Sequence, residues 1–266
     1  MSQLGARSLG GLSEIAPGED LAELVVRALA EQSPLEPLRE GQIVAIAHKA
    51  VSKAEGATVD LQTIEPGSRA RALADQAIAS PAAATGYARK DPRAVQVVLD
   101  QSAEVLRAAN GVLICRTHHG FVCANAGVDA SNSPDVETVV VLPRDPDASA
   151  RRIRARLREL TGARVGVLIS DSFGRAWRHG QCDVAIGCAG LAPLDDWRGR
   201  TDGAGSELRA TWLAVADAIA ALADLARAKD SREPVVIVDG LERFVTDDDG
   251  PGALTLIRPI GEDLFR

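Results

Sequence analysis

The chain has 266 residues, 46% of them hydrophobic and 25% charged, with a formal net charge of −7. This composition is typical of a globular protein with room for one large domain or two small lobes. The acidic balance argues against broad binding to nucleic acid or to an anionic membrane surface, and no apolar run reaches the roughly 20 residues of a membrane span. The N-terminus lacks the pattern of a secretory signal, so we expect a cytoplasmic protein.

The chain up to Leu106 predicts three helices and one short strand. Apolar residues recur at helical spacing over 19–32, and residues 67–79 also favour a helix. The apolar run 43–47 predicts a strand. Asp91 followed by Pro92 is a typical helix start, and the apolar spacing predicts that this helix continues to Leu106.

Over the whole chain, strands and helices are mixed without strict alternation, which favours an α+β fold over a doubly wound sheet. A basic amphipathic helix is expected from Asp145-Pro146 to about Gly162, with its arginines on a solvated face. Those arginines are Arg151, Arg152, Arg154, Arg156 and Arg158. The other expected elements are strands over 111–115, 137–142, 165–169 and 235–238, and an Ala-rich helix over 207–228.

Residues 169–181 form the most informative segment, because polar and glycine residues follow directly on the apolar strand 165–169. A buried strand that opens into such a segment is a common place for chemistry. Asp171 with Arg175 and Arg178 suggests a metal and a phosphate, or the two ends of one anionic substrate. In the simpler interpretation, Asp171 caps a helix and the two arginines are solvated.

Similar polar clusters lie at 11–15, 48–55 and 129–132, and the acidic turn 247–249 is a further candidate. We expect several of these loops to converge on one site. Asp129 and Asp171 could share a divalent cation, with Ser172 as a hydroxyl ligand, because Mg²⁺ and Mn²⁺ favour oxygen ligands. Three cationic side chains could neutralise phosphate oxygens: Lys53, Arg175 and Arg178.

Each of these residues also has a structural interpretation. Asp129 with Ser131 and Asn132 fits an Asx-type turn, Lys53 could be a surface lysine, and the acidic turn could be a solvated loop. Spacing leaves these alternatives open.

The four cysteines show no metal-binding spacing. We expect Cys115, Cys123, Cys182 and Cys188 to be small buried hydrophobic residues rather than zinc ligands with His118 or His119.

Several nucleotide and hydrolase motifs are missing from the sequence. It contains no GxxxxGK[ST] P-loop, no G-x-G-x-x-G after a strand and no G-x-S-x-G elbow. Residue spacing alone therefore predicts metal-assisted chemistry on an anionic substrate.

Five segments, taken in order, resemble the coenzyme F420:L-glutamate ligase family, also called gamma-glutamyl ligases. The similarity extends from about Gly11 to Phe265. The segments are AHKAVSKAEG at 47–56, AGVDASN at 126–132, LPRDPDASA at 142–150, SDSFGRAWR at 170–178 and GQ at 180–181.

This resemblance implies an enzyme that uses GTP and two Mg²⁺ or Mn²⁺ ions, with K⁺ as a further candidate ion. It implies addition of L-glutamate to the lactyl carboxylate of the deazaflavin precursor F420-0, followed by extension through gamma linkages. The implied fold is an unusual two-lobed α+β arrangement without a P-loop, in which 1–266 forms one ligase unit of two interwoven lobes. The implied assembly is an intertwined homodimer.

By position, the resemblance implies that Asp129 and Asp171 bind one metal and that Ser172 binds a second. Asp129 and Asp171, with Arg175, would be the catalytic residues. The implied GTP contacts are Leu12, Ser13, Glu14, Ile15, His48, Lys53 and Asn132. His48 departs from the Ser-Lys or similar pair of relatives. A C-terminal loop, aligned here with 245–252 and including Asp247 and Asp248, is implied to contact the second metal and the phosphates.

The chemistry implied by the resemblance is activation of a carboxylate as an acyl phosphate, which the amine of glutamate then attacks. Two other functions fit the same residues: a metal-dependent nucleotide phosphohydrolase and a non-catalytic GTP-binding regulator. In some relatives a flavin-dependent reductase domain follows the ligase, so a stand-alone ligase and a ligase domain are both compatible with this length.

Overall fold

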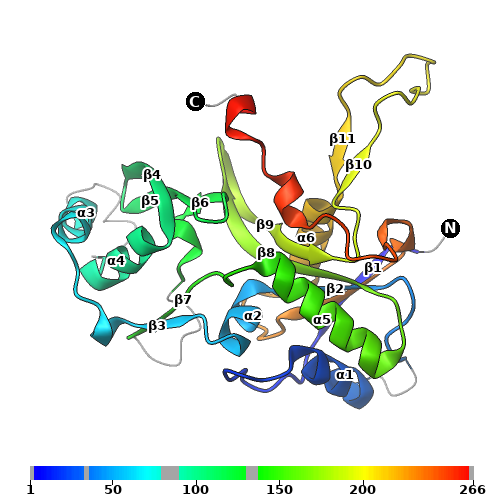
Figure 1. Cartoon of the computed structure of the whole chain (residues 1–266), viewed down its shortest axis with the longest axis horizontal. Helices are drawn as coiled ribbons and strands as arrows, with labels where there is room; N and C mark the ends of the chain where they lie inside the picture. Colours follow the sequence, from blue (N-terminus) through cyan, green and yellow to red (C-terminus); the bar gives the residue numbers. More distant parts are fainter. Residues whose placement is uncertain (1–2, 33–35, 79–89, 130–136, 264–266) are drawn as a thin grey trace.

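A computed structural model describes residues 3–32, 36–78, 90–129 and 137–263 (Figure 1). Its centre is a five-stranded mixed sheet with the strand order β1-β12-β2-β8-β9. Strands β2 and β8 pair in parallel, whereas the other neighbouring pairs are antiparallel. The strands are β1 (Gly5–Leu9), β2 (Ile43–Ala47), β8 (Gly166–Arg175), β9 (Arg178–Ala189) and β12 (Val235–Asp239).

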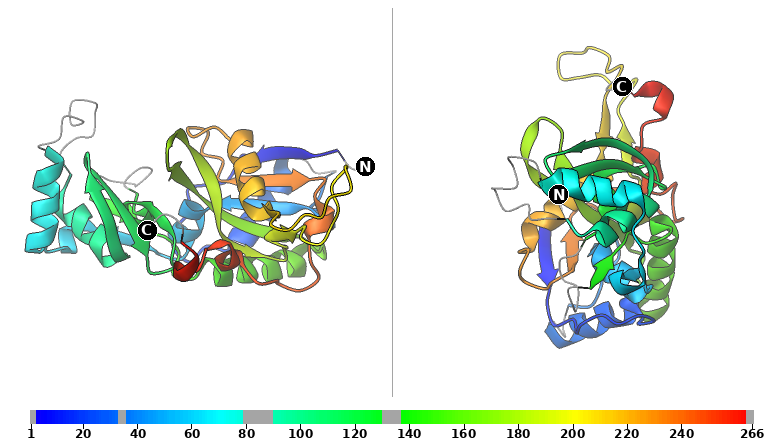
Figure 2. Two further views of the ribbon diagram at one scale, coloured as in Figure 1. Left: turned by 90° about the horizontal axis from the view of Figure 1, so that it is seen from above. Right: turned by 90° about the vertical axis from the view of Figure 1, so that its left-hand side faces the viewer.

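Helices cover both faces of this sheet (Figures 1 and 2). Helices α1 (Leu21–Gln32) and α5 (Pro146–Thr161) pack on one face, and α6 (Val215–Ala226) packs on the other. Alternate residues of β2 therefore enter different apolar cores, which explains its continuous apolar sequence. The short helix α2 (His48–Ala54) follows β2 directly.

A smaller group of elements lies beside this sheet. Helices α3 (Ser68–Ile78) and α4 (Pro92–Asp100) pack against a three-stranded sheet with an apolar cluster of its own. This segregation of helices and sheets confirms the expected α+β class. The division into two interwoven lobes stays a prediction. The strands are β4 (Ser102–Ala109), β5 (Val112–Thr117) and β6 (Val122–Ala124), and a ribbon of β3 (Thr58–Asp60) and β7 (Thr138–Val140) lies next to them.

A second two-stranded ribbon stands out from the body of the molecule (Figure 1). It consists of β10 (Leu194–Asp196) and β11 (Trp212–Ala214). None of the described helices is both long and apolar enough to cross a membrane. Short 3-10 turns complete the described chain: η1 (Leu61–Thr63), η3 (Asn125–Gly127), η4 (Glu242–Phe244), η5 (Ala253–Leu256) and η6 (Ile260–Glu262).

Local capping signals correctly predict the ends of two helices. Asp91 accepts a hydrogen bond from the Arg93 backbone at the start of α4, and Asp145 accepts one from Ala148 at the start of α5. Gly162 ends α5 in a left-handed conformation.

Two helix predictions are too long. Helix α4 ends at Asp100, and the rest of the predicted helix is strand β4. Asn110 and Gly111 adopt φ of 52° and 74°, a tight hairpin turn that pairs β4 with β5. The predicted helix 207–228 begins only at Val215, because residues 212–214 pair with β10.

The polar segment 169–181 is a hairpin rather than a loop. Strand β8 continues to Arg175, and β9 begins at Arg178. The pairing with β9 holds Asp171 in extended backbone, which excludes the helix-cap interpretation. Its side chain is therefore presented from a strand.

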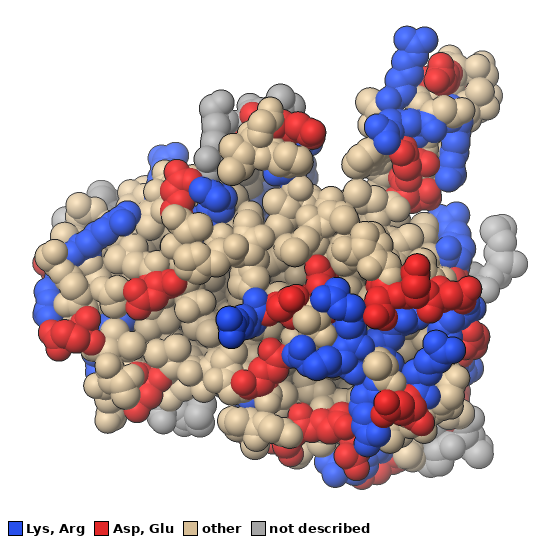
Figure 3. Space-filling model, viewed as in Figure 1, with Lys and Arg blue, Asp and Glu red and all other residues tan. Residues whose placement is uncertain are grey.

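The arginines of α5 divide between solvent and the interior. Lysine and arginine mix with acidic residues over this part of the surface (Figure 3), but Arg154 is buried. Its guanidinium donates to the Val165 carbonyl at 2.9 Å, the Thr246 carbonyl at 2.8 Å and Asp249 Oδ1 at 2.7 Å. The expectation of a solvated face is wrong for Arg154, which joins α5 to the acidic turn.

Replacement of Arg154 by Met should destabilise the fold by about 2–4 kcal/mol, because buried carbonyl groups would lose their donors. The free energy of unfolding in urea measures this effect. Arg152→Met on the same helix is the control, and its loss should stay below about 1 kcal/mol because Arg152 is exposed. Equal losses in the two variants would contradict a structural role specific to Arg154.

Candidate active site

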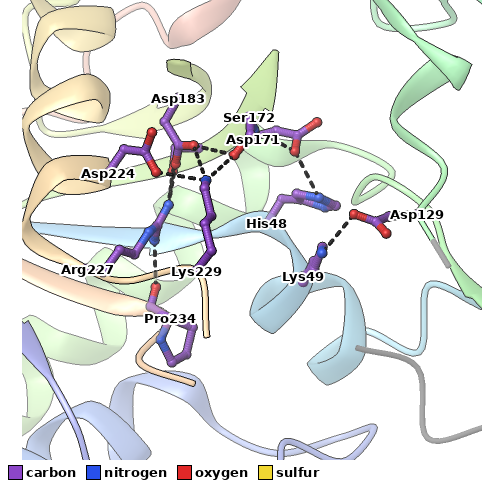
Figure 4. A network of polar contacts seen from close by, with 11 residues as sticks. His48, Lys49, Asp129, Asp171, Ser172, Asp183, Asp224, Arg227, Lys229 and Pro234 are labelled. Carbon is purple, nitrogen blue, oxygen red and sulfur yellow. Dashed lines mark hydrogen bonds and ion pairs between the residues drawn. The ribbon is translucent and has the colours of Figure 1, made fainter. Parts of the chain in front are cut away.

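The parallel pairing of β2 with β8 places the first residue of α2 beside Asp171. Ala47 is the register partner of Ser170, so the next residues along each strand, His48 and Asp171, meet. His48 Nε2 lies 3.2 Å from Asp171 Oδ1 (Figure 4). His48 is only 2% exposed, and neither ring nitrogen makes a well-aligned hydrogen bond to the described residues. Packing and the adjacent carboxylate therefore hold this ring.

Helix α2 makes two further contacts of opposite charge. Lys49 Nζ lies 2.7 Å from Asp129 Oδ2, and Lys53 Nζ lies 2.5 Å from Glu14 Oε1. Lys49 and Lys53 are four residues apart and so project from one face of the helix. Through this short helix the structure brings together the polar clusters at 11–15, 48–55, 129 and 171.

The position of Asp129 depends on a tight turn before it. Ala126 and Gly127 both adopt left-handed φ, of 53° and 72°. A side chain on Gly127 would place its Cβ 2.6 Å from Leu142 Cγ. After this turn, Asp129 exchanges two backbone hydrogen bonds with Val140, which fixes the carboxylate beside α2.

A cavity of about 420 Å³ connects these groups. Asp129, Asp171, Ser172 and Gln181 contribute to its lining, and apolar residues of α4 supply another part. Lys90 also lines it, and burial lowers the pKa of its ammonium group. The cavity thus combines oxygen ligands, a cationic group and an apolar surface, as sites for anionic organic substrates do.

The donor groups fit the expected divalent cation. Three carboxylates, those of Asp91, Asp129 and Asp171, and the hydroxyl of Ser172 line the cavity, and Asp91 pairs with Arg93. Within the described ranges, no group of three His, Cys, Asp or Glu side chains is arranged so that it could hold a metal ion without other ligands. Mg²⁺ is commonly held by one or two carboxylates together with substrate phosphates and water rather than by an all-protein cage. Asp129, Asp171 and Ser172 are therefore suitable for a cation that arrives with a nucleotide.

Sequence reasoning missed a second polar network behind the hairpin (Figure 4). Asp183 on β9 is 1% exposed and accepts hydrogen bonds from Ser170 Oγ at 2.8 Å and Ser172 Oγ at 2.5 Å. Arg227 and Lys229, which follow α6, both pair with it. The one sequence signal for this network is an acidic residue within the otherwise apolar run 182–189.

The environment of Asp183 keeps it ionised. Burial is the largest influence and by itself would raise its pKa. The hydrogen bond from Ser172, the charge of Arg227, the hydrogen bond from Ser170 and the charge of Lys229 outweigh burial, so the pKa is below its ordinary value. Asp183 is therefore a fixed negative charge beneath Ser172.

The other predicted residues are found in several places. Arg175 lies at the hairpin tip, where it donates to the His179 carbonyl at 2.6 Å, and Arg178 is exposed there. Ile15 is buried in the main core and Leu12 packs against it, whereas Ser13 is exposed. Asn132 lies outside the described residues.

The acidic turn does not join this group of residues. Asp247 pairs with Arg164 and Asp249 with Arg154, both near the start of β8. Asp248 accepts a hydrogen bond from the backbone of Gly250 in the same turn. The turn thus lies near the start of β8, away from Asp171, and a role of Asp247 and Asp248 toward the second metal and the phosphates stays a prediction.

The cysteines are free thiols, and three of them are buried. Cys123 lies near the site, where burial, followed by the charge of Asp171, raises its pKa to about 12. Such a thiol is protonated at neutral pH and is a poor nucleophile.

The sequence matches the family model described as F420-0:Gamma-glutamyl ligase over residues 11–240. Coenzyme F420:L-glutamate ligase from Methanopyrus kandleri is 44% identical, with 95% of this chain and 94% of that protein covered. The protein of the same name from Methanothermobacter thermautotrophicus is 41% identical, with 96% of each chain covered. The one from Methanocaldococcus jannaschii is 42% identical over 86% of each chain.

Replacement of Gly127 by Ala should destabilise the fold by about 2–4 kcal/mol, because strained backbone and contact with Leu142 add up. Gly162→Ala is the matched control: it has a similar φ of 73° but open space around its Cβ, so we expect a loss of about 1 kcal/mol. Thermal and urea unfolding measure both. Equal losses would show that the approach of Gly127 to Leu142 does not matter.

Proposed function

The chain belongs to the F420-0:gamma-glutamyl ligase family, and on this premise we propose that it joins L-glutamate to coenzyme F420-0 and extends a gamma-linked glutamate tail, with GTP as the energy source. The observation that supports this most directly is the convergence on α2, where His48 contacts Asp171 and Lys49 contacts Asp129, the two carboxylates that line one cavity.

The proposed assembly is a homodimer, and light scattering would measure its mass.

The proposed reaction has two balanced steps. A carboxylate oxygen of F420-0 attacks the γ-phosphorus of GTP, which forms an acyl phosphate and releases GDP. The amine nitrogen of glutamate then attacks the acyl carbon, which forms the amide and releases inorganic phosphate. Both steps are favoured by positioning and by neutralisation of phosphate charge.

In this proposal, Asp129 and Asp171 bind one divalent cation and Ser172 binds a second. When bound, the cations would neutralise phosphate charge and orient the phosphoryl group. His48 contacts Asp171 and Lys49 contacts Asp129, so each of these two carboxylates has a polar or cationic neighbour on α2. K⁺ stays a candidate additional ion.

GTP is proposed to lie along the same helix. The contact of Lys53 with Glu14 connects α2 to the N-terminal loop 12–15, so the nucleotide contacts proposed for Lys53 and for this loop would be adjacent. His48, at the start of the same helix, is a further proposed contact. Asn132 is a further proposed contact, and Arg175 is proposed to reach the phosphate or the anionic tail of the substrate.

Product masses test the function itself. The protein is incubated with F420-0, glutamate, GTP and Mn²⁺, and products are identified by mass spectrometry. We expect a ladder of products separated by one glutamate residue. Release of phosphate without such products would instead indicate a phosphohydrolase, and GTP binding without any product would indicate a regulator.

Asp171→Asn should reduce kcat on the order of a thousandfold, because a neutral amide is a poor ligand for a divalent cation. Single-turnover rates with GTP, glutamate and F420-0 measure this loss. The control is Asp100→Asn, an exposed carboxylate at the end of α4 that we expect to leave the rate unchanged. Near-normal turnover by Asp171→Asn would remove this residue from the metal site.

Lys53→Met should raise the KM for GTP about tenfold or more, through loss of one charged hydrogen bond. Stability should change by less than about 1 kcal/mol, because the Glu14 side chain that pairs with Lys53 is 76% exposed. Initial rates at varied GTP, together with urea unfolding, separate these effects. An unchanged KM for GTP would show that Lys53 is not a nucleotide contact.

A further inference from the structure

Asp183, Arg227 and Lys229 form the part of the polar network that no sequence motif assigns. We propose that Asp183 is a positioning residue that fixes the hydroxyl group of Ser172 for cation binding. The inference rests on the proposed function, in which Ser172 binds the second divalent cation. It goes beyond that proposal because Asp183 itself would touch neither cation nor substrate.

The register of the hairpin places these two residues together. Ser172 and Asp183 are direct cross-strand partners on β8 and β9. Successive side chains of a strand point to opposite faces, so Ser170 shares a face with Ser172, whereas Asp171 points the other way. This agrees with the contacts, since both serines reach Asp183 and Asp171 reaches His48 (Figure 4).

The two oxygens of Asp183 have separate partners. Oδ2 binds Ser170 Oγ and the Arg227 guanidinium, which also donates to the Pro234 carbonyl at 3.2 Å. Oδ1 accepts from Ser172 Oγ at 2.5 Å and, at the longer distance of 3.4 Å, from Lys229 Nζ. Because Arg227 is buried and anchored to the backbone, Oδ2 fixes the carboxylate and Oδ1 is left to orient Ser172.

The hydrogen-bonding capacity of Ser172 shows what this orientation achieves. A serine hydroxyl has one proton and two lone pairs. Its proton goes to Asp183 Oδ1, and one lone pair accepts from Lys229 Nζ at 2.6 Å. Among the described residues, the second lone pair has no hydrogen-bond donor, so it is available to a cation. Without Asp183 the proton could rotate into that direction.

The test measures Mn²⁺ affinity by electron paramagnetic resonance in the presence of a non-hydrolysable GTP analogue. Asp183→Asn should weaken Mn²⁺ binding about 10–100-fold, the usual effect of losing a group that orients a metal ligand. Ser170→Ala is the matched control, because Ser170 bonds Asp183 Oδ2 and Arg227 but not Oδ1, and the Mn²⁺ affinity of this variant should stay within about twofold. Ser172→Ala should lose at least as much affinity as Asp183→Asn.

A second variant protects the test against misfolding, since Asp183→Asn leaves Arg227 buried without its counterion. Asp183→Asn combined with Arg227→Met removes both charges and should show the same loss of Mn²⁺ affinity. Thermal unfolding confirms that each variant is folded.

Two results would overturn different claims. The metal assignment of the proposed function fails if the native protein binds no Mn²⁺, or if Ser172→Ala binds Mn²⁺ with the same stoichiometry and affinity as the native protein. This inference then fails with it. If Ser172→Ala loses affinity but folded Asp183→Asn or the double variant binds as tightly as the native protein, the inference alone fails.

Discussion

The parallel pairing of β2 with β8 is the constraint on which the candidate site depends. It aligns Ala47 with Ser170. After this pair, the chain leaves the sheet at the end of β2, whereas β8 continues, so the residues that follow Ala47 lie beside those that follow Ser170. The continuation of β2 is α2, which carries His48, Lys49 and Lys53. A shift of one residue in this register would turn Asp171 to the other face of the sheet and away from α2.

The degree of burial determines which carboxylates can exchange a cationic side chain for a bound cation. The side chains of Asp129 and Asp171 are 37% and 14% exposed, whereas that of Asp183 is 1% exposed. A carboxylate that solvent reaches can give up a lysine or histidine contact for another cation at modest cost. A buried ion pair such as Asp183 with Arg227 is costly to open. Hence Asp129 and Asp171 suit ligand binding, and Asp183 suits support.

Sequence patterns predict the elements whose signals are local. The apolar run of β2, the caps of α4 and α5, and the left-handed Gly162 lie within the elements they define. The hairpin of β8 and β9 is different, because Trp177 takes the left-handed φ of 59° at a position without glycine. Without that turn, neither the pairing of Ser172 with Asp183 nor the contribution of Arg227 can be derived. The Asn110-Gly111 dipeptide is typical of a hairpin turn and so indicates the pairing of β4 with β5. The apolar spacing over 95–106 also fits a helix, which is why the predicted helix is too long.

The residues that hold the acidic turn and those that line the cavity lie at different points along β8. Near its start, Arg154 and Arg164 bind the acidic turn, and in its middle Asp171 and Ser172 line the cavity. The five residue steps from Gly166 to Asp171 correspond to about 17 Å of extended chain. An acidic turn that follows a strand is therefore weak evidence for a ligand site unless its own partners are known. Here two of the three acidic residues have arginine partners, Asp247 with Arg164 and Asp249 with Arg154, so their charges already have a structural role.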